Sequence, residues 1–120
     1  MQLVLILVRF APPWKQAPAN GQERERQDVR RQELVEAANR TIQSHIGFPW
    51  TASVRIEIRY TRHGRSGPDP ANIIGGIADA LQGIAYQNDR QLTQIRYDES
   101  GGSFDEYEVQ LHLLNEANCV

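Results

Sequence analysis

A strict alternation of apolar and charged side chains between residues 54 and 60 constrains the fold of this chain most. The apolar positions are Val54, Ile56, Ile58 and Tyr60, and a charged residue lies between each pair. Because successive side chains of a strand point to opposite faces of a sheet, the segment predicts a half-buried strand. A fold built on this strand has a sheet with one covered face and one face toward solvent.

An amphipathic helix is predicted from Gln22 to about Ile46, because apolar side chains recur there every four residues. The stripe consists of Leu34, Ala38, Ile42 and Ile46, with His45 packed along its edge. Gly47 and Pro49 follow with the chemistry that ends a helix. The first turns are almost wholly charged, which predicts that this end of the helix is solvated.

A second helix is predicted from Pro70 to about Gln82. Asp69 followed by Pro70 is a strong helix-start signal, because an aspartate side chain caps the first turn and proline fits the first helical position. Two adjacent glycines, Gly75 and Gly76, lie inside this helix, where each costs roughly 1 kcal/mol relative to alanine. One explanation for the pair is a close approach of another element to the helix.

Three further segments are predicted to be strands: the apolar run Leu3–Val8, expected to be buried on both faces, and the segments Gln91–Tyr97 and Tyr107–Leu113. The resulting β-α-β-α-β-β order predicts an α+β domain over residues 1–114, with a mixed sheet, both helices on one face and a C-terminal tail at 115–120. A sheet this small buries little surface by itself, so we expect a homodimer.

Charge is distributed unevenly along the chain, although the formal net charge is only -2 and the pI is about 5.9. Residues 1–65 carry a formal net charge of +5, and residues 66–120 carry -7. The total gives no indication of binding to nucleic acid or membrane by bulk charge. The distribution fits a site where a polyanion meets a metal ion held by carboxylates, and it fits chance equally well.

The cellular location is predicted from cysteine usage and from the first strand. Cys119 is the single cysteine, so it forms no internal disulfide, which is typical of a reducing cytosol. The run Leu3–Val8 is too short to span a bilayer, and no basic segment precedes it as in a signal peptide. We therefore expect a cytoplasmic protein without a membrane partner.

The residues best suited to chemistry lie between Arg55 and Asp89. Carboxylates stand at Asp69, where the second helix starts, and at Asp89, before the next strand; they are predicted to converge at one end of the sheet. Oxygen ligands there suit Mg²⁺, which takes one or two carboxylates with phosphate oxygens and water. The loop before the helix supplies Arg62 and Arg65, whose guanidinium groups would hold a phosphodiester backbone.

Each of these residues also has a purely structural interpretation, which the sequence leaves open. Asp69 is explained as a helix cap and Asp89 as the end of a turn. Asp79 lies on the same helix face as Asn72 and is explained as a solvated side chain. An arginine-rich loop is usually a solvated surface. No phosphate-binding loop or dinucleotide fingerprint is present, so no small-molecule cofactor is expected.

Two segments of this chain resemble the core of the RusA-type Holliday-junction resolvases: residues 68–83 (PDPANIIGGIADALQG) and residues 88–92 (NDRQL). In that family a D-x-D-N-x-x-K segment runs on into D-A-L, and an Asp-Asp pair follows before a strand. A first strand that ends in prolines and a lysine, Lys15 here, also matches. The resemblance implies a homodimeric endonuclease that needs Mg²⁺ or Mn²⁺ and resolves four-way DNA junctions in recombination and repair.

The resemblance also implies roles for individual residues. It places the metal ligands at Asp69, Asp89, Asn72 and Asn88, of which the two aspartates are catalytic. With the loop arginines Arg62 and Arg65, Lys15 is expected to contact the DNA backbone. Asp79, in the D-A-L segment, is implied to support the ligands from a second layer.

Three departures from the family pattern bear on activity. Ala71 replaces the second aspartate of D-x-D, and Gly75 replaces the lysine, while Asn88 replaces an acid of the later pair. A lost carboxylate weakens a metal site, and a lost cation removes charge that stabilises the transition state. Glu57 is one candidate replacement ligand. Two alternatives to an active nuclease therefore remain: a catalytically inactive DNA-binding dimer, and an interaction module of the same fold that does not bind DNA.

Overall fold

The computed structural model describes residues 2–114, so the tail predicted at 115–120 and Cys119 lie outside the described residues. The elements in chain order are β1 (Leu3–Val8), α1 (Gly21–Ile42), β2 (Val54–His63), α2 (Pro70–Leu81), the 3-10 turn η1 (Asp89–Gln91), β3 (Leu92–Gly102) and β4 (Glu106–Leu113). Strands and helices therefore follow the predicted β-α-β-α-β-β order. The predicted α+β class is confirmed.

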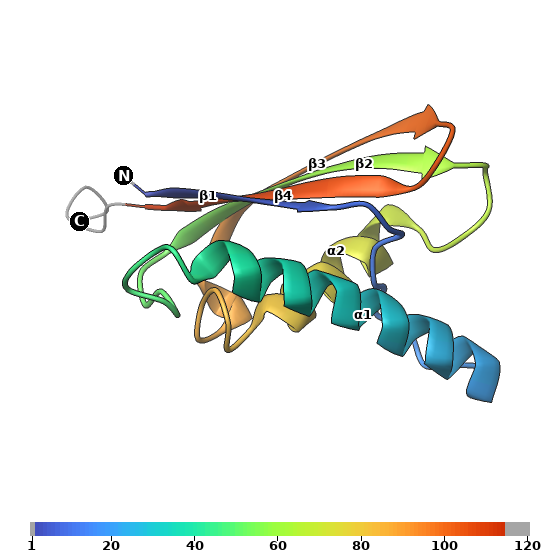
Figure 1. The fold of residues 1–120 in the computed structure, drawn as a ribbon, viewed down its shortest axis with the longest axis horizontal. Coiled ribbons are helices and arrows are strands. Elements are labelled where there is room, and N and C mark those ends of the chain that lie inside the picture. Colours follow the sequence, from blue (N-terminus) through green and yellow to red (C-terminus); the bar gives the residue numbers. More distant parts are fainter. Residues whose placement is uncertain (1, 115–120) are drawn as a thin grey trace.

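The four strands form one mixed sheet in the order β1-β4-β2-β3. β2 and β3 are parallel, whereas β4 runs antiparallel to both β1 and β2. A parallel pair needs a crossover connection, and α2 provides it. Both helices lie on the same face of the sheet, as predicted (Figure 1). Neither helix in the described part of the chain has the length and hydropathy needed to cross a membrane.

The core lies between the sheet and the two helices. The alternation in β2 is confirmed, because Val54, Ile56 and Ile58 are fully buried while the residues between them are partly or largely exposed. The helices contribute Leu34, Ala38, Ile73, Ile77 and Leu81, all of which are fully buried. Burial of one such aliphatic side chain stabilises the fold by roughly 1.5–3 kcal/mol, so this layer fixes α1 and α2 on the sheet.

The prediction that the first strand is buried on both faces is wrong. Leu3, Leu5 and Leu7 are between 51% and 53% exposed, while the residues that alternate with them are buried. The reason is that both helices cover the same face of the sheet, so the other face of β1 remains open. The apolar run therefore covers the core with one side and leaves a row of leucines on the open face.

Helix α1 ends one turn earlier than its apolar spacing predicts. Its last residue is Ile42, and Ile46 is 88% exposed, so the predicted packing of His45 and Ile46 is wrong. The side chains of Ser44 and His45 both contact the carbonyl oxygen of Thr41, at 3.2 and 3.1 Å. Local polar capping therefore ends the helix before its apolar stripe does.

Strands β2 and β3 extend further than predicted. Residues 61–63 of β2 pair with residues 100–102 of β3, and both segments lie beyond the predicted ends of their strands, at residues 60 and 97. This added pairing carries the sheet beyond the helix-covered core. It also brings β3 alongside the loop between β2 and α2, which residues 64–69 form.

Candidate metal and nucleic-acid site

Asp69 caps the N-terminus of α2, as the sequence predicted. One carboxylate oxygen, Oδ1, accepts the backbone N–H of Asn72 at 2.8 Å, and Pro70 occupies the first helical turn. The side chain is exposed, and its second carboxylate oxygen makes no hydrogen bond within residues 2–114. Asp69 therefore serves as a cap and still presents an anionic oxygen to solvent.

The loop that leads to Asp69 is held by a buried arginine. Arg62 donates to both carboxylate oxygens of Glu99, from Nε at 2.9 Å and from Nη2 at 3.0 Å. It also donates to the carbonyl oxygens of Ser66 at 3.1 Å and Pro68 at 2.9 Å. The hydrogen bond from Arg62 is the main reason that the pKa of Glu99 lies below its ordinary value, and the same bond raises the pKa of Arg62.

The two loop arginines that were predicted to contact DNA, Arg62 and Arg65, have different surroundings in the structure. The guanidinium of Arg62 faces the protein and is engaged at each of its nitrogens. Arg65 is exposed and lines the same open hollow as Asp69, at the ends of β2 and β3. Arg65 is therefore the loop arginine that is free to meet a phosphate next to the Asp69 carboxylate.

Asp89 lies in a short turn beyond the C-terminal end of α2, and this turn is held differently from the loop before Asp69. Its backbone N–H donates to Oε1 of Gln82, the residue that ends α2, at 3.2 Å. The turn is pinned by Gln91, whose Oε1 accepts the backbone N–H groups of Gln87 and Asn88, both at 2.9 Å. The side chain of Asn88 caps the turn by accepting the N–H of Arg90. Asn88 thus has a structural role here, and Asp89 is exposed.

The expected convergence of Asp69 and Asp89 does not occur within one chain. Asp69 precedes the first residue of α2 and Asp89 contacts the residue after its last, so the whole helix separates them. Twelve helical residues span roughly 18 Å, far more than the separation of about 4–6 Å at which two carboxylates share one ion. Residues 2–114 contain no group of three or more His, Cys, Asp or Glu side chains able to hold a metal ion. A single chain therefore does not complete the implied two-aspartate site.

Lys15 lies in the loop after β1 and is hydrogen-bonded to α2 through its backbone. Its backbone N–H donates to the carbonyl oxygen of Asn72 at 2.8 Å, and a Cβ added to Gly75 would lie 3.3 Å from the Lys15 Cβ. A Cβ added to Gly76 would lie 2.6 Å from the Cα of Trp14. The close approach expected from the two glycines is therefore real, and it brings Lys15 to the side of α2.

Asp79 joins the two helices. Its carboxylate pairs with Arg31 of α1 at 3.1 Å, and both side chains are about half exposed. Along the helix Asp79 lies nearer to Gln82 than to Asp69. Any supporting role for Asp79 would therefore concern the Asp89 end of α2.

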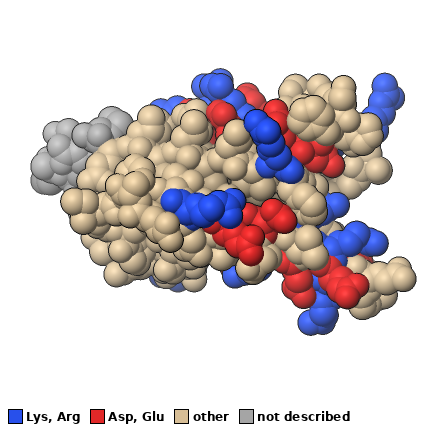
Figure 2. Space-filling view, viewed as in Figure 1, with Lys and Arg blue, Asp and Glu red and all other residues tan. Residues whose placement is uncertain are grey.

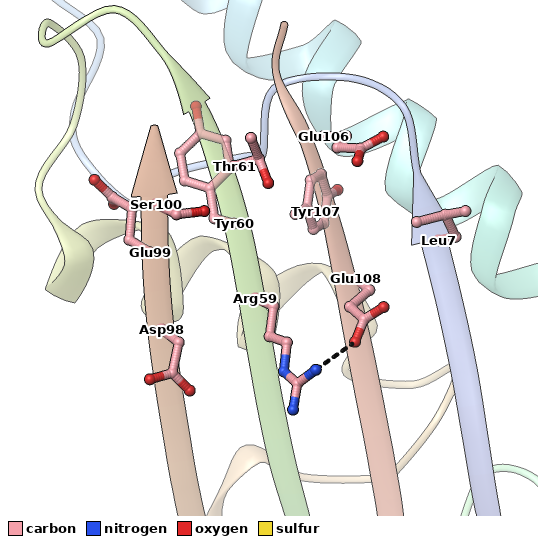
Figure 3. A pocket seen from close by; sticks show the side chains of 10 residues that line it. All are labelled: Leu7, Arg59, Tyr60, Thr61, Asp98, Glu99, Ser100, Glu106, Tyr107 and Glu108. Carbon is pink, nitrogen blue, oxygen red and sulfur yellow. Dashed lines mark ion pairs between the residues drawn. The ribbon is translucent and has the colours of Figure 1, made fainter. Parts of the chain in front are cut away.

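The open face of the sheet carries a second group of charges that is separate from α2. Arg59 of β2 lies between Asp98 of β3 and Glu108 of β4 and pairs with Glu108 at 3.9 Å (Figure 3). The hollow beside them contains one arginine and four acids: Asp98, Glu99, Glu106 and Glu108. An acidic excess of this kind repels a polyanion, so this hollow is unsuited to DNA.

Glu57, the candidate replacement ligand, also lies on the open face. Burial raises its pKa, but the charge of Arg55 and hydrogen bonds from His112 and Arg55 outweigh burial, so the pKa of Glu57 lies below its ordinary value. Arg55 and His112 approach its carboxylate at 2.7 and 3.2 Å. Because α2 covers the opposite face of the sheet, Glu57 and Asp69 of the same chain do not form one site.

Charged side chains of both signs gather toward the end of the molecule where α1 begins, in the view of Figure 2. The end near the chain termini carries fewer charges on this face. Blue and red are interleaved, so no large single-sign surface dominates this view. Contact with a polyanion would therefore depend on a few local cations rather than on a broad basic surface.

The described chain is thus a small mixed sheet with two helices on one face, and an exposed capping aspartate lies beside an exposed arginine at the start of α2. The model of the family described as Endodeoxyribonuclease RusA matches residues 6–112, which include both helices and nearly the whole sheet. The chain belongs to the RusA family. Members of this family are Holliday-junction resolvase endonucleases that bind junction DNA and generally depend on divalent metal ions. No curated protein matches the chain.

Sequence reasoning missed Glu99 and Gln91, the two side chains that fix the ends of α2. Glu99 accepts hydrogen bonds from Arg62 across a sequence separation of 37 residues, and no local sequence pattern predicts such a pair. Gln91 had a usable signal, because an Asn followed three residues later by Gln is a capping-box pattern.

Proposed function

We propose that this chain is a homodimeric endodeoxyribonuclease that binds four-way DNA junctions and cuts them in the presence of Mg²⁺ or Mn²⁺, in recombination and repair. The observation that carries this proposal is the exposed carboxylate of Asp69 beside Arg65, in a chain that belongs to the RusA family over residues 6–112. The arginine supplies a phosphate contact, and the carboxylate supplies a hard oxygen ligand next to it.

Contact with the DNA backbone is assigned to Arg65 and Lys15. Arg65 is exposed in the hollow that contains Asp69, and Lys15 is bonded through its backbone to Asn72 on the first turn of α2. Arg65 would position a phosphate near the Asp69 carboxylate, and Lys15 would hold one along the side of α2, in a hollow that Asp79 also lines. Neither contact reads the base sequence. Such a small set of cations predicts modest affinity that weakens as the salt concentration rises.

The metal ligands are proposed to come from two copies of the chain. Asp69 and Asn72 belong to one end of α2, and Asp89 and Asn88 to the other. Two α2 helices that pair antiparallel about a two-fold axis would bring Asp69 of one chain toward Asp89 of the partner subunit. The bound Mg²⁺ would activate water and stabilise the charge that develops on the scissile phosphate.

A homodimer also accounts for symmetric cutting. Two equivalent incisions in a four-way junction need two equivalent sites, and a two-fold axis supplies them. Within each site the chain's own residues have separate tasks: Asp69 presents its carboxylate, and Arg65 and Lys15 orient the backbone. The arrangement makes cleavage dependent on dimer formation.

A catalytically inactive junction-binding dimer is the second candidate. Ala71 and Gly75 favour it, because each removes a charged group that the family pattern has at that position. This candidate keeps the DNA contacts of Arg65 and Lys15 and predicts binding that divalent metal does not convert to cleavage. A module that does not bind DNA would show neither behaviour.

The proposal is tested with a labelled four-way junction incubated with the protein and Mg²⁺ or Mn²⁺. The control is Asp69→Asn, because asparagine caps a helix about as well as aspartate and the fold is kept. Symmetric nicking by the wild type that the control loses supports the nuclease. A gel shift without nicking supports the inactive binder, and the absence of both removes DNA from the function.

A further inference from the structure

We propose that Arg62 and Glu99 act together as a positioning pair that holds the loop presenting Asp69, and that neither contacts DNA. The inference rests on the proposed function of Asp69. Arg62 is the only buried charged side chain in the described part of the chain, with 8% of its surface exposed. A buried charge is tolerated when it is paired and hydrogen-bonded, so the partners of Arg62 indicate its role.

The loop between β2 and α2 has few other restraints. Gly64 and Gly67 adopt positive φ angles of 81° and 116°, and the residues between them are exposed. A Cβ added to Gly67 would lie 2.9 Å from Nη1 of Arg62, so the loop wraps closely around the guanidinium. The bond from Arg62 to the Pro68 carbonyl then fixes the backbone immediately before Asp69.

The other side of the guanidinium is bonded to side chains of the sheet. Glu99 is held by the hydroxyl of Tyr97 as well as by Arg62, and Arg62 lies over the ring of Tyr60, 5.1 Å from its centroid. The Tyr60 hydroxyl donates to Asp105 at 2.7 Å, which ties the end of β2 to the turn before β4. Arg62 therefore connects the end of the sheet, which side-chain hydrogen bonds hold, to a loop that has few hydrogen bonds of its own.

A direct phosphate contact and a positioning role predict opposite effects for one substitution. If Arg62 bound DNA, Glu99→Gln would release its charge and strengthen junction binding, while Arg62→Gln would weaken it. If the two residues position Asp69 together, both substitutions loosen the same loop. Their effects are then not additive, because each removes the same interaction.

The first experiment measures amide hydrogen exchange of the free protein and needs no DNA. The N–H of Asn72 reports on the cap, because it donates to Asp69 Oδ1. In Arg62→Gln, Glu99→Gln and the double variant we expect this amide to exchange faster by roughly tenfold or more, with Arg62→Lys in between. Val109, buried in β4, controls for global unfolding, and Arg59→Gln removes an exposed arginine of the same strand as a matched control.

The second experiment measures junction binding and nicking of the same variants over a range of salt concentrations. A positioning pair leaves the salt dependence of binding unchanged in Arg62→Gln and lowers the nicking rate of bound junction in both single variants. Tighter binding by Glu99→Gln with wild-type exchange at Asn72 would overturn the inference. If the wild type neither binds nor nicks the junction, the proposed function fails, while the exchange at Asn72 still decides whether the pair holds the cap.

Discussion

The two ends of α2 present similar aspartates by different means. At the N-terminal end, Asp69 follows a glycine-containing loop whose path depends on the buried charge of Arg62. At the C-terminal end, Asp89 lies in a short turn held by the neutral amide of Gln91. One end therefore depends on an ion pair and the other on neutral hydrogen bonds, so the two respond differently to substitution and to pH.

The largest expected effect is on the rate of junction nicking when the aspartate at either end of α2 is replaced. Asp69→Asn and Asp89→Asn each remove one carboxylate charge while keeping a side chain of similar size. If both carboxylates serve one metal ion, each variant should lower junction nicking on the order of a hundredfold or more, because metal stabilisation of the reacting phosphate amounts to several kcal/mol. Nicking assays at equal protein concentration test this. Loss in only one variant would show that the two ends are not equivalent.

The body of α2, which connects the two ends, is expected to tolerate substitution at one glycine and not at its neighbour. In Gly76→Ala the new Cβ would meet the Trp14 backbone at 2.6 Å and the Pro13 carbonyl at 2.7 Å. We expect destabilisation of about 3 kcal/mol, since backbone cannot move aside easily. In Gly75→Ala the new Cβ meets the Cβ of Lys15 at 3.3 Å, which a small shift of the Lys15 loop relieves, so its stability should lie within about 1 kcal/mol of the wild type. Urea unfolding of the two variants measures the difference, and equal stabilities would contradict the packing.

The C-terminal end can be weakened alone through Gln91. Its Nε2 donates to the carbonyl oxygens of Trp50 and Ala52, both at 2.8 Å, in addition to the two bonds that Oε1 accepts. Gln91→Ala should destabilise the protein by about 2 kcal/mol, because partly buried groups lose their partners. Gln94→Ala, at an exposed position of β3, is the matched control. Thermal unfolding compares them, and unchanged Asn72 exchange in Gln91→Ala would show that the N-terminal end is independent.

The smallest expected effect is a difference in pH response. Because Arg62 lowers the pKa of Glu99 in the folded state, the pair contributes stability above the ordinary glutamate pKa of 4.5 and loses it as pH falls through the lowered value. The stability advantage of the wild type over Glu99→Gln should therefore shrink between about pH 6 and about pH 3.5. Gln91→Ala should show no such convergence with the wild type, since Gln91 does not titrate. Urea midpoints at the two pH values provide the measurement.

Local signals in the sequence predicted local structure well. The Asp69-Pro70 pair located the start of α2 because the cap and its helix are adjacent in the chain. The predicted burial of Leu3–Val8 on both faces was wrong because both helices cover one face of the sheet, and the apolar run itself does not encode which faces are covered. The same limit explains why the environment of Arg62 was missed, since the parallel register of β2 and β3 brings Glu99 beside it.

The candidate site was predicted only in part for a related reason. The residue types and the family were recognisable from residues 68–92, and the exposed position of Asp69 agrees with a binding role. The expected convergence of Asp69 and Asp89 fails because twelve helical residues hold them apart. Whether a second copy brings such groups together depends on assembly, which periodicity and spacing in one chain do not encode.

The most direct test of a site shared between two chains is a mixture of Asp69→Asn and Asp89→Asn proteins that have been allowed to exchange subunits. In a mixed dimer, one shared site has lost both aspartates and the other retains both. The account predicts that each variant alone is inactive and that the mixture regains nicking of a four-way junction, on one strand rather than symmetrically. If each chain used its own two aspartates, every site in the mixed dimer would lack one of them. An inactive mixture, with subunit exchange verified, would contradict the account.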